Sequence, residues 1–566
     1  MNQVTLTERI KPKDSSEITD EFKKIAPRDQ SNCCDGILKA KNFPGLEETS
    51  SELNDRIYRW TFIPRVMSAA LWPIILIYST YKIYLETTDS KFDLFHRTYP
   101  GIFTNVTGRG VDKFDHLWFV LSGDFFGKCY LWYGFYGGFA RLIQIYMPQA
   151  LPTFSMLLSF GFVSYLMGFR ILAFFLLELV VFWIVQRLRS KLALWMTVVG
   201  YLYFMSHGYY EKLLLDENPS VITYYMFTVI GWIHARCISF YYDTWNRPNR
   251  SSLASLYTSA QFCFYFPLTV WGPLEYFERY EKYILLPSKF GKSTEVVKQE
   301  LLRMIVKLGR FIFWALVNEL LLHYVYFTYL SYHPVYLETI NFWALIGILY
   351  WLGQFLQLKY LVLNGIPGVI AEADGLPMLP LPKCVACIHR FSNLWKSIDR
   401  GMYNWFIRYC YSPVLEIIAR VDKTNGLQPE FQRILASLPA FLFVYTWHAW
   451  ELRILIWASL NFFCVSAERI GGFLKNKINQ KYNVAPAIWD VLIEPMVNIP
   501  FLTISCCSSG LFSSSIATGK VMAYRIPQGY QFIVIGWGYT HLGVLIDTWP
   551  KVREVVFRRS KSHHEN

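Results

Sequence analysis

The sequence predicts an all-α protein that crosses a membrane many times. Hydrophobic residues make up 53% of the 566 residues and charged residues only 17%, whereas a soluble protein carries about 25% charged residues. Apolar runs near the roughly 20 residues that a spanning helix needs recur along the chain. We therefore expect about ten to twelve membrane segments in one body, the shorter ones being re-entrant or interfacial. The runs are 66–85, 151–169, 171–185, 192–205, 221–234, 256–271, 311–330, 342–356, 438–450, 452–465, 497–512 and 532–546.

Both ends of the chain are polar. Residues 1–60 contain no apolar core of a signal peptide, so we expect no cleaved signal, and the run 66–85 would act as an uncleaved anchor. The tail 551–566 is rich in Lys and Arg. The positive-inside rule then predicts that both termini are cytosolic and that the number of crossings is even. Asn105-Val106-Thr107 would lie in a luminal loop and would be able to accept a glycan.

The net charge is positive: 55 Lys and Arg stand against 42 Asp and Glu, which gives +13. This excess fits cytosolic loops that face anionic lipid headgroups. Nucleic-acid binding is not indicated, because the basic residues are scattered among the apolar runs and form no basic module. The 11 cysteines form no disulfide framework. Cys384 and Cys387 have CxxC spacing, but no second pair supplies a zinc site.

A helix that lies in the membrane interface is predicted over 391–411. A loop rich in Gly and Pro, 365–382, precedes it. One face would carry only apolar residues at helical spacing, and the opposite face would be polar. The apolar residues are Phe391, Leu394, Trp395, Ile398, Met402, Trp405, Phe406 and Tyr409, and the polar ones are Lys396, Arg400, Asn404 and Arg408. A segment of this kind is typical of an interfacial helix.

Asp399 does not fit this helix, because on the helical wheel it falls beside the apolar stripe. Two interpretations are open. The carboxylate could form an ion pair with Arg400 or Lys396 at the water boundary. Alternatively, it could serve chemistry, because a carboxylate can orient a catalytic base or act on a leaving group.

His448 is a second exception, since it lies within the apolar aromatic run 441–450. An ionisable residue inside a membrane segment is a functional candidate by default, and His is the usual general base near neutral pH. The alternative is a neutral His bonded to a neighbouring helix. Burial alone does not single it out, because other ionisable residues also lie in or at the ends of apolar runs: His207, His234, His323, His541, Glu319 and Asp547. Enclosure of Asp399 and His448 in such a segment would exclude water from the reacting groups.

Four segments together resemble the membrane-bound O-acyltransferase family, and more closely its Hedgehog acyltransferase branch and the glycerol-uptake-protein-like members. The third and fourth segments are the most specific in order and spacing. The segments are Arg236-Cys237-Ile238-Ser239-Phe240-Tyr241-Tyr242-Asp243; Phe264-Tyr265-Phe266-Pro267 with Gly272-Pro273 and Phe277; Phe391-Ser392, Trp395, Asp399 and Gly401 continuing to Tyr411-Ser412-Pro413; and Phe443-Val444-Tyr445-Thr446-Trp447-His448 with Trp457, Asn461 and Glu468.

The resemblance implies a multi-span enzyme of the endoplasmic reticulum, with an acyltransferase body over 61–550 between the polar segment 1–60 and the basic cytosolic tail 551–566. Acyl-CoA would enter from the cytosol. A long-chain acyl group, palmitoyl in this branch, would pass to the N-terminal cysteine amine of a secreted protein. Membrane lipid would surround the body, and nucleic acid would not be a partner.

The resemblance also implies roles for single residues. His448 matches the catalytic His of the family, and Asp399 matches the acidic partner found in the branch. Trp395 matches the residue that gates the acyl-CoA site. Trp447, Asn404 and Arg408 are the other residues expected to bind substrate.

Cys384 matches a cysteine that ligates haem in the Hedgehog branch, so haem is a candidate cofactor. A palmitoylated or free thiol at the interface is the alternative. As a co-substrate, acyl-CoA is implied by the resemblance in either case.

The sequence departs from the branch at two places. After Ser412-Pro413 the branch has a short Gly-Gly turn, whereas this chain has a longer polar connection that extends to Pro429. After His448 it has Ala449-Trp450 instead of two glycines. Both places lie near the expected acceptor side, so the acceptor stays open. The catalytic residues are unaltered, which argues against an inactive relative that has lost the His.

Two other functions are compatible with these motifs. One is an O-acyltransferase that acts on a lysolipid or on a lipid-anchored protein, with the same His and the same acyl-CoA channel. The other is a transporter or a non-catalytic scaffold. Transporters often contain inverted repeats with broken helices, and the sequence shows no such repeat.

Overall fold

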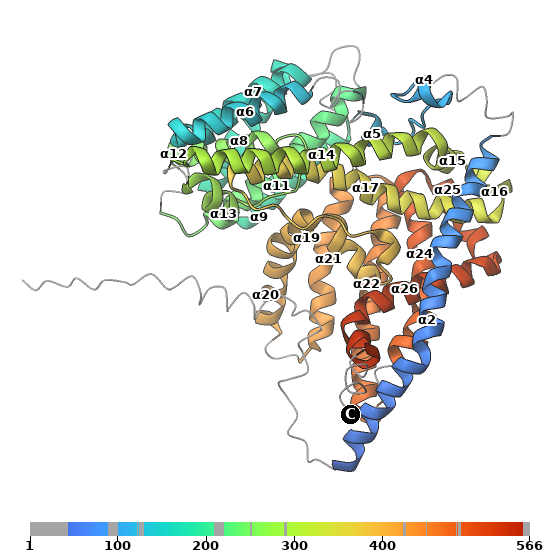
Figure 1. Ribbon diagram of the computed structural model, residues 1–566. Helices are drawn as coiled ribbons and strands as arrows, with labels where there is room; N and C mark the ends of the chain where they lie inside the picture. The colour runs from blue at the N-terminus through green and yellow to red at the C-terminus, as the bar shows by residue number, and fades with distance from the viewer. Residues whose placement is uncertain are drawn as a thin grey trace, which may run out of the picture. The chain divides into compact units, whose positions relative to one another are not determined.

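The computed structural model describes residues 44–88, 100–120, 123, 129–208, 220–248, 252–287, 291–422, 426–448, 450–482, 484 and 488–557. Every regular element in these ranges is helical, and they contain no strand, which confirms the predicted all-α class (Figure 1). The chain separates into two units, Met1–Arg56 and Ile57–Asn566. The second unit contains all four sequence motifs and both candidate catalytic residues.

The first helices comprise one long helix and a group of shorter ones. The predicted run 66–85 lies within the long helix α2. Gly168 separates α7 from α8 and has φ +92°, a value that glycine adopts without strain. The helices are α2 Pro44–Glu86, α4 Thr104–Thr107, α5 His116–Val120, α6 Tyr130–Tyr146, η2 Pro148–Ala150, α7 Leu151–Met167, α8 Phe169–Arg187 and α9 Lys191–Ser206.

The central helices include α17, which is 33 residues long and largely buried. It runs beside α14 (Figure 1). The Asp374 carboxylate at its end accepts hydrogen bonds from Tyr136, at 2.6 Å, and from Arg141, so it fastens α6 to α17. The elements are α11 Ser220–Asp243, α12 Leu253–Cys263, η3 Phe266–Leu268, α13 Phe277–Tyr280, η4 Glu281–Leu285, α14 Thr294–Tyr324, α15 Phe327–Tyr332, α16 Pro334–Thr339 and α17 Phe342–Asp374.

The last third of the second unit contains the motifs around Asp399 and His448. Here α22 packs against both α21 and α24. The elements are η6 Val385–Cys387, α18 Phe391–Ile398, α19 Arg400–Phe406, η7 Ile407–Tyr411, α20 Ser412–Val421, α21 Pro429–Trp447, α22 Leu452–Tyr482, η8 Trp489–Ile493, α24 Glu494–Ser513, α25 Ile516–Arg525, η9 Ile526–Gln528 and α26 Tyr530–Phe557.

Six helices among the described residues are long and apolar enough to span a membrane, so the predicted count of about ten to twelve is not confirmed. The run 256–271 does not form one helix, because α12 ends at Cys263 and η3, which contains Pro267, begins at Phe266. The run 438–450 falls partly in α21, which is not one of these six helices. The six are Arg56–Glu86, Pro148–Met167, Phe169–Arg187, Phe342–Asp374, Leu452–Tyr482 and Glu494–Ser513.

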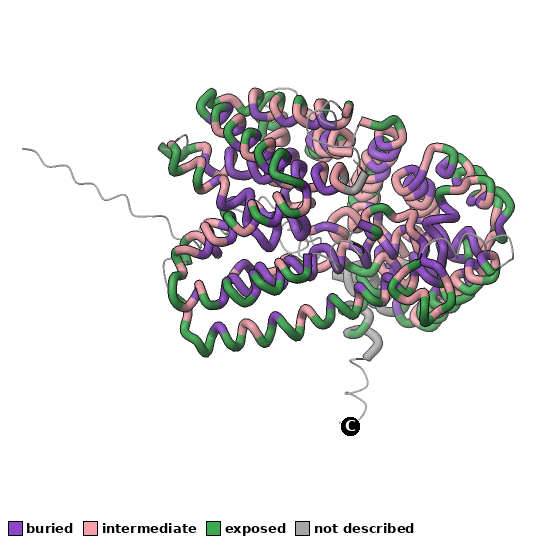
Figure 2. Tube along the Cα trace, turned by 90° about the horizontal axis from the view of Figure 1, so that it is seen from above, coloured by how far each residue is buried: buried purple, intermediate pink, exposed green. Residues whose placement is uncertain are grey.

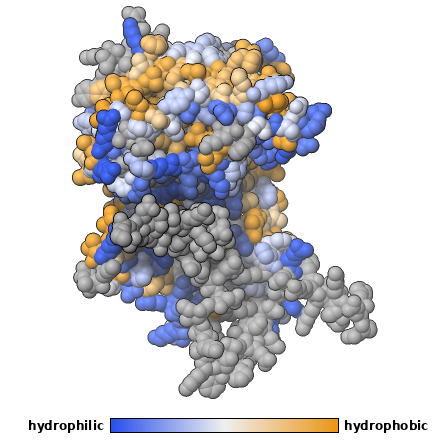
Figure 3. Space-filling model, turned by 90° about the vertical axis from the view of Figure 1, so that its left-hand side faces the viewer, coloured by the Kyte–Doolittle hydropathy of each residue, from blue (hydrophilic) through white to orange (hydrophobic). Residues whose placement is uncertain are grey.

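Large apolar side chains remain exposed on these helices, as expected where lipid is the solvent. On α8, Leu177, Val180 and Ile184 are exposed at helical spacing, while Leu179 and Phe182 on the other side are buried. Figure 2 shows buried segments on the inner sides of many helices and exposed segments on their outer sides. Apolar side chains also gather over the upper part of the face drawn in Figure 3. Both observations favour a body embedded in a membrane.

Candidate active site

The predicted helix over 391–411 is interrupted at Asp399, so the prediction of one continuous interfacial helix is wrong. Helix α18 ends at Ile398, Asp399 is extended with φ −133° and ψ 99°, and α19 begins at Arg400. The Asp399 side chain accepts a hydrogen bond from the Met402 backbone N–H at 2.9 Å. This is an N-cap, which a helical wheel does not anticipate because the wheel assumes a continuous helix.

The Asp399 carboxylate is buried, with 8% of its surface exposed. Its Oδ1 receives the capping hydrogen bond, whereas Oδ2 has no hydrogen-bond partner among the described residues. Asn364 of α17 lies beside it, and burial raises the pKa of the carboxyl group. The guanidinium of Arg400 lies over the ring of Tyr403, 5.9 Å from its centre. Asp399 therefore has an acceptor atom still free for a substrate or a proton.

His448 lies at the C-terminal cap of α21, where its backbone N–H donates to the Val444 carbonyl at 3.1 Å. It thus follows the helix, although the sequence pattern placed it in the middle of an apolar run. The partly buried imidazole meets two aromatic rings edge-on, Phe512 at 5.3 Å and Trp457 at 6.4 Å between ring centres. Helices α21, α22 and α24 therefore meet at this ring.

Trp395 joins α18 to α22, the helix whose Trp457 lies beside His448. Its indole N–H donates to Asn461 Oδ1 at 3.2 Å, and its ring lies 5.4 Å from that of Trp457. Asn461 Nδ2 in turn donates to the Trp457 carbonyl at 2.6 Å. Trp457, which contacts both Trp395 and His448, thus links the two predicted site segments.

Glu468, two turns further along α22, holds the start of α18. Its carboxylate accepts the backbone N–H of Ser392 at 2.8 Å and also that of Phe391. These are unpaired donors at a helix N-terminus, where a negative charge is also favoured by the helix dipole. The motif residues of α22 therefore fix the position and direction of α18.

No hydrogen bond joins the Asp399 carboxylate to the His448 ring within the part of the chain that the structure describes. The contacts that connect them run through Trp395, one turn before Asp399, and through Trp457. The two groups therefore do not form a preassembled pair of acid and base. They are presented from separate helices.

The three other residues predicted to bind substrate have different surroundings. The Trp447 indole packs against Gly231 of α11, where an added Cβ would lie 2.6 Å from the ring. Arg408 forms ion pairs with Asp243 at 3.0 Å and with Glu278 at 2.5 Å. Asn404 is partly buried in α19. A role of these residues in substrate binding stays a prediction.

Arg408 belongs to a hydrogen-bond network on α11, which the sequence identified as a motif without assigning it a role. Asp243 accepts hydrogen bonds from Arg408 and Tyr409, and the Glu278 backbone N–H donates to it at 3.1 Å. Ser239 accepts the backbone N–H of Phe277 at 2.7 Å. Burial raises the pKa of Asp243, against the opposing effect of Arg408. We call a set of six side chains the α11 network: Arg236, Ser239, Asp243, Glu278, Arg408 and Tyr409.

Arg236 completes this network. Its guanidinium donates to the carbonyl of Cys263 at 2.7 Å and to that of Leu268, on either side of the turn that contains Pro267. The side chains at 236, 239 and 243 share one face of α11, because three and four residues separate them. From the sequence, this spacing was the one indication that the three side chains contact the same neighbouring segment.

The described surroundings of Cys384 do not support a haem at this thiol. Its exposed thiol lies 3.4 Å from Gln354 of α17, and the Cys387 thiol lowers the pKa of Cys384 to about 6. The adjacent turn packs directly on other helices. Tyr539 of α26 bonds the Val385 carbonyl at 3.0 Å, and Val385 lies in ordinary contact distance of the Gly353 position in α17. These contacts supply no observation that points to a bound porphyrin, and haem is not supported.

The other histidines raised by the sequence have structural partners. His234 Nε2 lies 2.8 Å from the Glu178 carboxylate, and both side chains are fully buried. His323 Nδ1 lies 2.9 Å from the Arg109 carbonyl oxygen. His541 lies against Trp537, with 4.6 Å between ring centres. His448 differs from His234 and His323, which have polar partners, because its described neighbours are aromatic rings, as is that of His541.

A family model for membrane-bound O-acyltransferases matches residues 244–499. This part of the chain is a membrane-bound O-acyltransferase domain. Asp399, Trp395 and His448 all lie inside it, whereas Arg236 and Ser239 lie just before it. The predicted resemblance is therefore confirmed.

Curated relatives place the acyltransferase domain in the predicted branch. Protein-cysteine N-palmitoyltransferase HHAT of Mus musculus is 30% identical over 207 residues, which cover 37% of this chain and 39% of that protein. Protein-cysteine N-palmitoyltransferase Rasp of Drosophila melanogaster is 30% identical over 211 residues, 37% and 38% of the two chains. Membrane-bound O-acyltransferase GUP1 of Candida tropicalis is 29% identical over 203 residues, 35% and 31%. The alignments thus span less than two fifths of each relative.

Proposed function

We propose that this protein transfers a long-chain acyl group, palmitoyl, from acyl-CoA to the N-terminal cysteine amine of a secreted protein in the endoplasmic reticulum membrane. The two relatives named as protein-cysteine N-palmitoyltransferases support this choice of acceptor. The observation that carries the proposal is the environment of His448, whose imidazole is enclosed by Trp457 and Phe512 at the meeting point of three helices.

In the proposed reaction the acceptor amine attacks the thioester carbonyl carbon. His448 accepts the proton that the amine loses, as a general base. The carbon–sulfur bond then breaks, an amide forms, and CoA leaves as a thiolate that takes up a proton. The protein gains and loses no atoms, since the proton held by His448 returns to the leaving group or to solvent. The aromatic enclosure keeps water from hydrolysing the thioester.

Asp399 would act from the opposite side of the substrate. Its unpaired Oδ2 can accept a hydrogen bond from the acceptor amine, and in its protonated form the group can donate to the departing thiolate. Burial raises the pKa of this carboxyl group, which makes the protonated form accessible nearer neutral pH. Because the substrate lies between the two residues, a direct contact between Asp399 and His448 is not needed.

The test uses the full chain in proteoliposomes with labelled palmitoyl-CoA and a peptide that begins with cysteine. We expect transfer to this peptide and none to the same peptide with an acetylated N-terminus. His448→Ala should abolish transfer. His207→Ala is the matched control, because His207 also caps a helix and lies against an aromatic ring, Tyr203. Undiminished transfer by the His448 variant would exclude the proposed base.

A second candidate is O-acylation of a lysolipid or of a lipid-anchored protein. The match to a relative named membrane-bound O-acyltransferase favours it, as does the altered sequence after Ser412-Pro413. The same proteoliposomes supplied with lysophospholipid in place of the peptide separate the two. Labelled phospholipid as the sole product would replace the first proposal by the second, whereas loss of both products in His448→Ala would support the shared chemistry.

The proposed orientation places both termini in the cytosol and Asn105 in the lumen. Asn105 lies in the short helix α4, and its side chain is exposed. Glycosidase-sensitive mobility that disappears in Asn105→Gln would support this orientation. Labelling of a cysteine introduced at this position from the cytosolic side would contradict it.

A further inference from the structure

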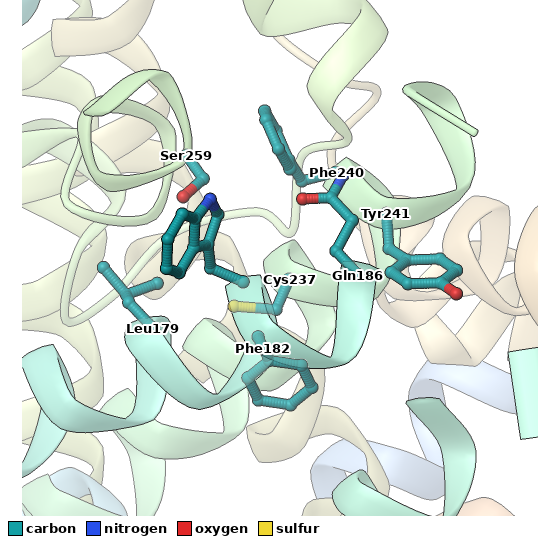
Figure 4. Close-up of a pocket in the computed structure, with 8 residues that line it drawn as sticks. Leu179, Phe182, Gln186, Cys237, Phe240, Tyr241 and Ser259 are labelled. Atoms are coloured by element: carbon teal, nitrogen blue, oxygen red, sulfur yellow. The ribbon is translucent and has the colours of Figure 1, made fainter. Parts of the chain in front are cut away.

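The space enclosed between α8, α11 and α12 is too small to hold a substrate (Figure 4). Leu179, Cys237 and Ser259, one from each helix, belong to its lining. Its volume is about 20 Å³, which is room for about one water molecule. An acceptor peptide therefore cannot bind there, whereas the chain just after His448 has two features of a binding segment.

The first feature is the backbone of Trp450, two residues after His448. Its φ is +58°, in the left-handed region that bulky residues rarely adopt. Among the described residues other than glycine, positive φ occurs at one further position, Arg189 in the turn between α8 and α9. Glycine would adopt this conformation without strain. A strained residue of this kind persists where its surroundings fix it, and such residues cluster at active sites and ligand clamps.

Contacts from several helices fix the turn that carries Trp450. The Tyr445 hydroxyl donates to the Trp450 carbonyl at 3.2 Å, and its ring lies edge-on to the indole with 5.6 Å between centres. Tyr203 of α9 meets the indole at a right angle, 5.7 Å between centres. Where the turn enters α22, the Arg453 guanidinium donates to the Phe512 carbonyl of α24 at 2.7 Å. The position of the indole is therefore set by α9, α21 and α24 together.

The second feature is the indole N–H of Trp450. Its nitrogen is buried and has no hydrogen-bond partner among the described residues. A buried donor in this state is costly unless a ligand or water supplies an acceptor. The indoles of Trp72, Trp232 and Trp271 are unpaired in the same way, so this feature alone does not identify a site. At Trp450 it coincides with a strained backbone and with a place beside the proposed base.

We propose that Trp450 binds the acceptor peptide, its indole N–H donating a hydrogen bond to a backbone carbonyl oxygen of the first two residues while the N-terminal amine lies at His448. This inference rests on the proposed transfer to an N-terminal amine. The Cα atoms of His448 and Trp450 are at most about 7 Å apart, and the first two carbonyl oxygens of a peptide lie within about the same distance of its N-terminal nitrogen. A peptide with its amine at His448 therefore brings a carbonyl oxygen within reach of the indole. Recognition of this kind depends on the peptide backbone and is independent of the side chains of the acceptor.

The first test uses Trp450→Phe, which keeps an aromatic ring and removes the donor, in the proteoliposome assay described above. We expect KM for the peptide to rise roughly fivefold, the factor that corresponds to one hydrogen bond. KM for palmitoyl-CoA and the unfolding temperature should stay near the wild-type values. Trp72→Phe is the matched control, because it removes another buried, unpaired indole N–H, on α2, and it should behave as the wild type. An unchanged KM for the peptide in Trp450→Phe would overturn the proposal.

The second test changes the acceptor instead of the protein. Two peptides that begin with cysteine have either the first or the second amide bond replaced by a trans-alkene, which removes one carbonyl oxygen without adding charge. For the wild type, one of them should show a KM raised roughly fivefold, and Trp450→Phe should show no further rise with that same peptide. Equal KM values for all peptides in the wild type would overturn the proposal even if the variant does not fold.

The two proposals fail in different ways. If the wild type acylates no peptide that begins with cysteine, the proposed function fails and the role of Trp450 fails with it. If the wild type transfers palmitate to the peptide and the alkene peptides lose equally in both proteins, the role of Trp450 is wrong and the proposed function stands.

Discussion

The α11 network and the region around His448 are both polar sites within an apolar body, but they differ in how their polar groups are satisfied. In the α11 network Asp243 accepts hydrogen bonds from Arg408, Tyr409 and the Glu278 backbone. In the other region Asp399 retains an unpaired Oδ2, and the neighbours described for the His448 ring are aromatic.

This difference separates a structural role from a chemical one. A buried polar group with all its partners gives rigidity to the segments that it joins. A buried acceptor without a partner is costly unless a ligand or water completes it. We therefore expect substitutions in the α11 network to change stability, and substitutions near His448 and Asp399 to change turnover with little change in stability.

The largest effect is expected for His448→Gln. Loss of a general base lowers the rate by about 10² to 10⁴-fold, and glutamine is close enough in size to keep the contacts with Trp457 and Phe512. Single-turnover transfer of palmitate measures the rate, and thermal unfolding in detergent measures stability. A rate loss that is matched by an equally large loss of stability would remove the distinction between the two regions.

Asp243→Ala should have the next largest effect, and on stability. It leaves Arg408 and Tyr409 without their shared acceptor, and for this partly buried pair the loss should cost about 1 to 3 kcal/mol. Asp243→Asn is the matched control, because it keeps an acceptor oxygen and should cost less. Thermal unfolding compares the two. If both variants unfold at the wild-type temperature, the network does not hold α11 to its neighbours.

Tyr409→Phe should have a smaller effect of the same kind. It removes one hydroxyl that bonds Asp243 at 2.9 Å and Ser239 at 3.0 Å, and a single buried hydrogen bond contributes about 1 kcal/mol. We expect a small fall in unfolding temperature and an unchanged KM for palmitoyl-CoA. A raised KM without loss of stability would instead assign this network to substrate binding.

Asn461→Leu should have the smallest effect, and on substrate binding. It deprives the Trp395 indole of its acceptor at 3.2 Å, so the ring loses a constraint worth about 1 kcal/mol. If Trp395 borders the acyl-CoA site, KM for palmitoyl-CoA should rise roughly fivefold, with kcat nearly unchanged. Asn498→Leu, a substitution of another buried asparagine, provides a control for the change in size and polarity. Identical kinetics in the two variants would count against a role for Trp395 in the site.

Much of this fold could be predicted, because composition and periodicity depend on single residues and their neighbours. The low share of charged residues and the repeated apolar runs predicted an all-α membrane body, and the motifs near Asp399 and His448 predicted the family. The number of spans could not be predicted so well. The run 256–271 is apolar, but Pro267 interrupts its helix, and a hydropathy average does not detect the effect of a proline.

The details of the candidate site could be predicted less well from the sequence. Asp399 was recognised as an exception on a helical wheel, but its hydrogen bond to the Met402 N–H ends the helix that the wheel assumed. The ion pair between Arg408 and Asp243 joins residues 165 positions apart, which a single sequence cannot show. By sequence, His234 had the same standing as His448, and only the structure revealed its partner, the buried Glu178.

The hydrogen bonds between α22 and α18 have a consequence for how the protein responds to the membrane around it. Helix α22 has 31 residues, and its apolar part, which ends before Glu468, is shorter than the hydrocarbon core of a typical bilayer. In a thicker bilayer such a helix is accommodated by local thinning of the bilayer and by movement of its flanking residues. Because Glu468 and Asn461 tie α18 to this helix, such a movement would also shift Trp395 and Asp399. Turnover should therefore vary with the chain length of the host lipids, which would make the enzyme responsive to the thickness of the membrane in which it works.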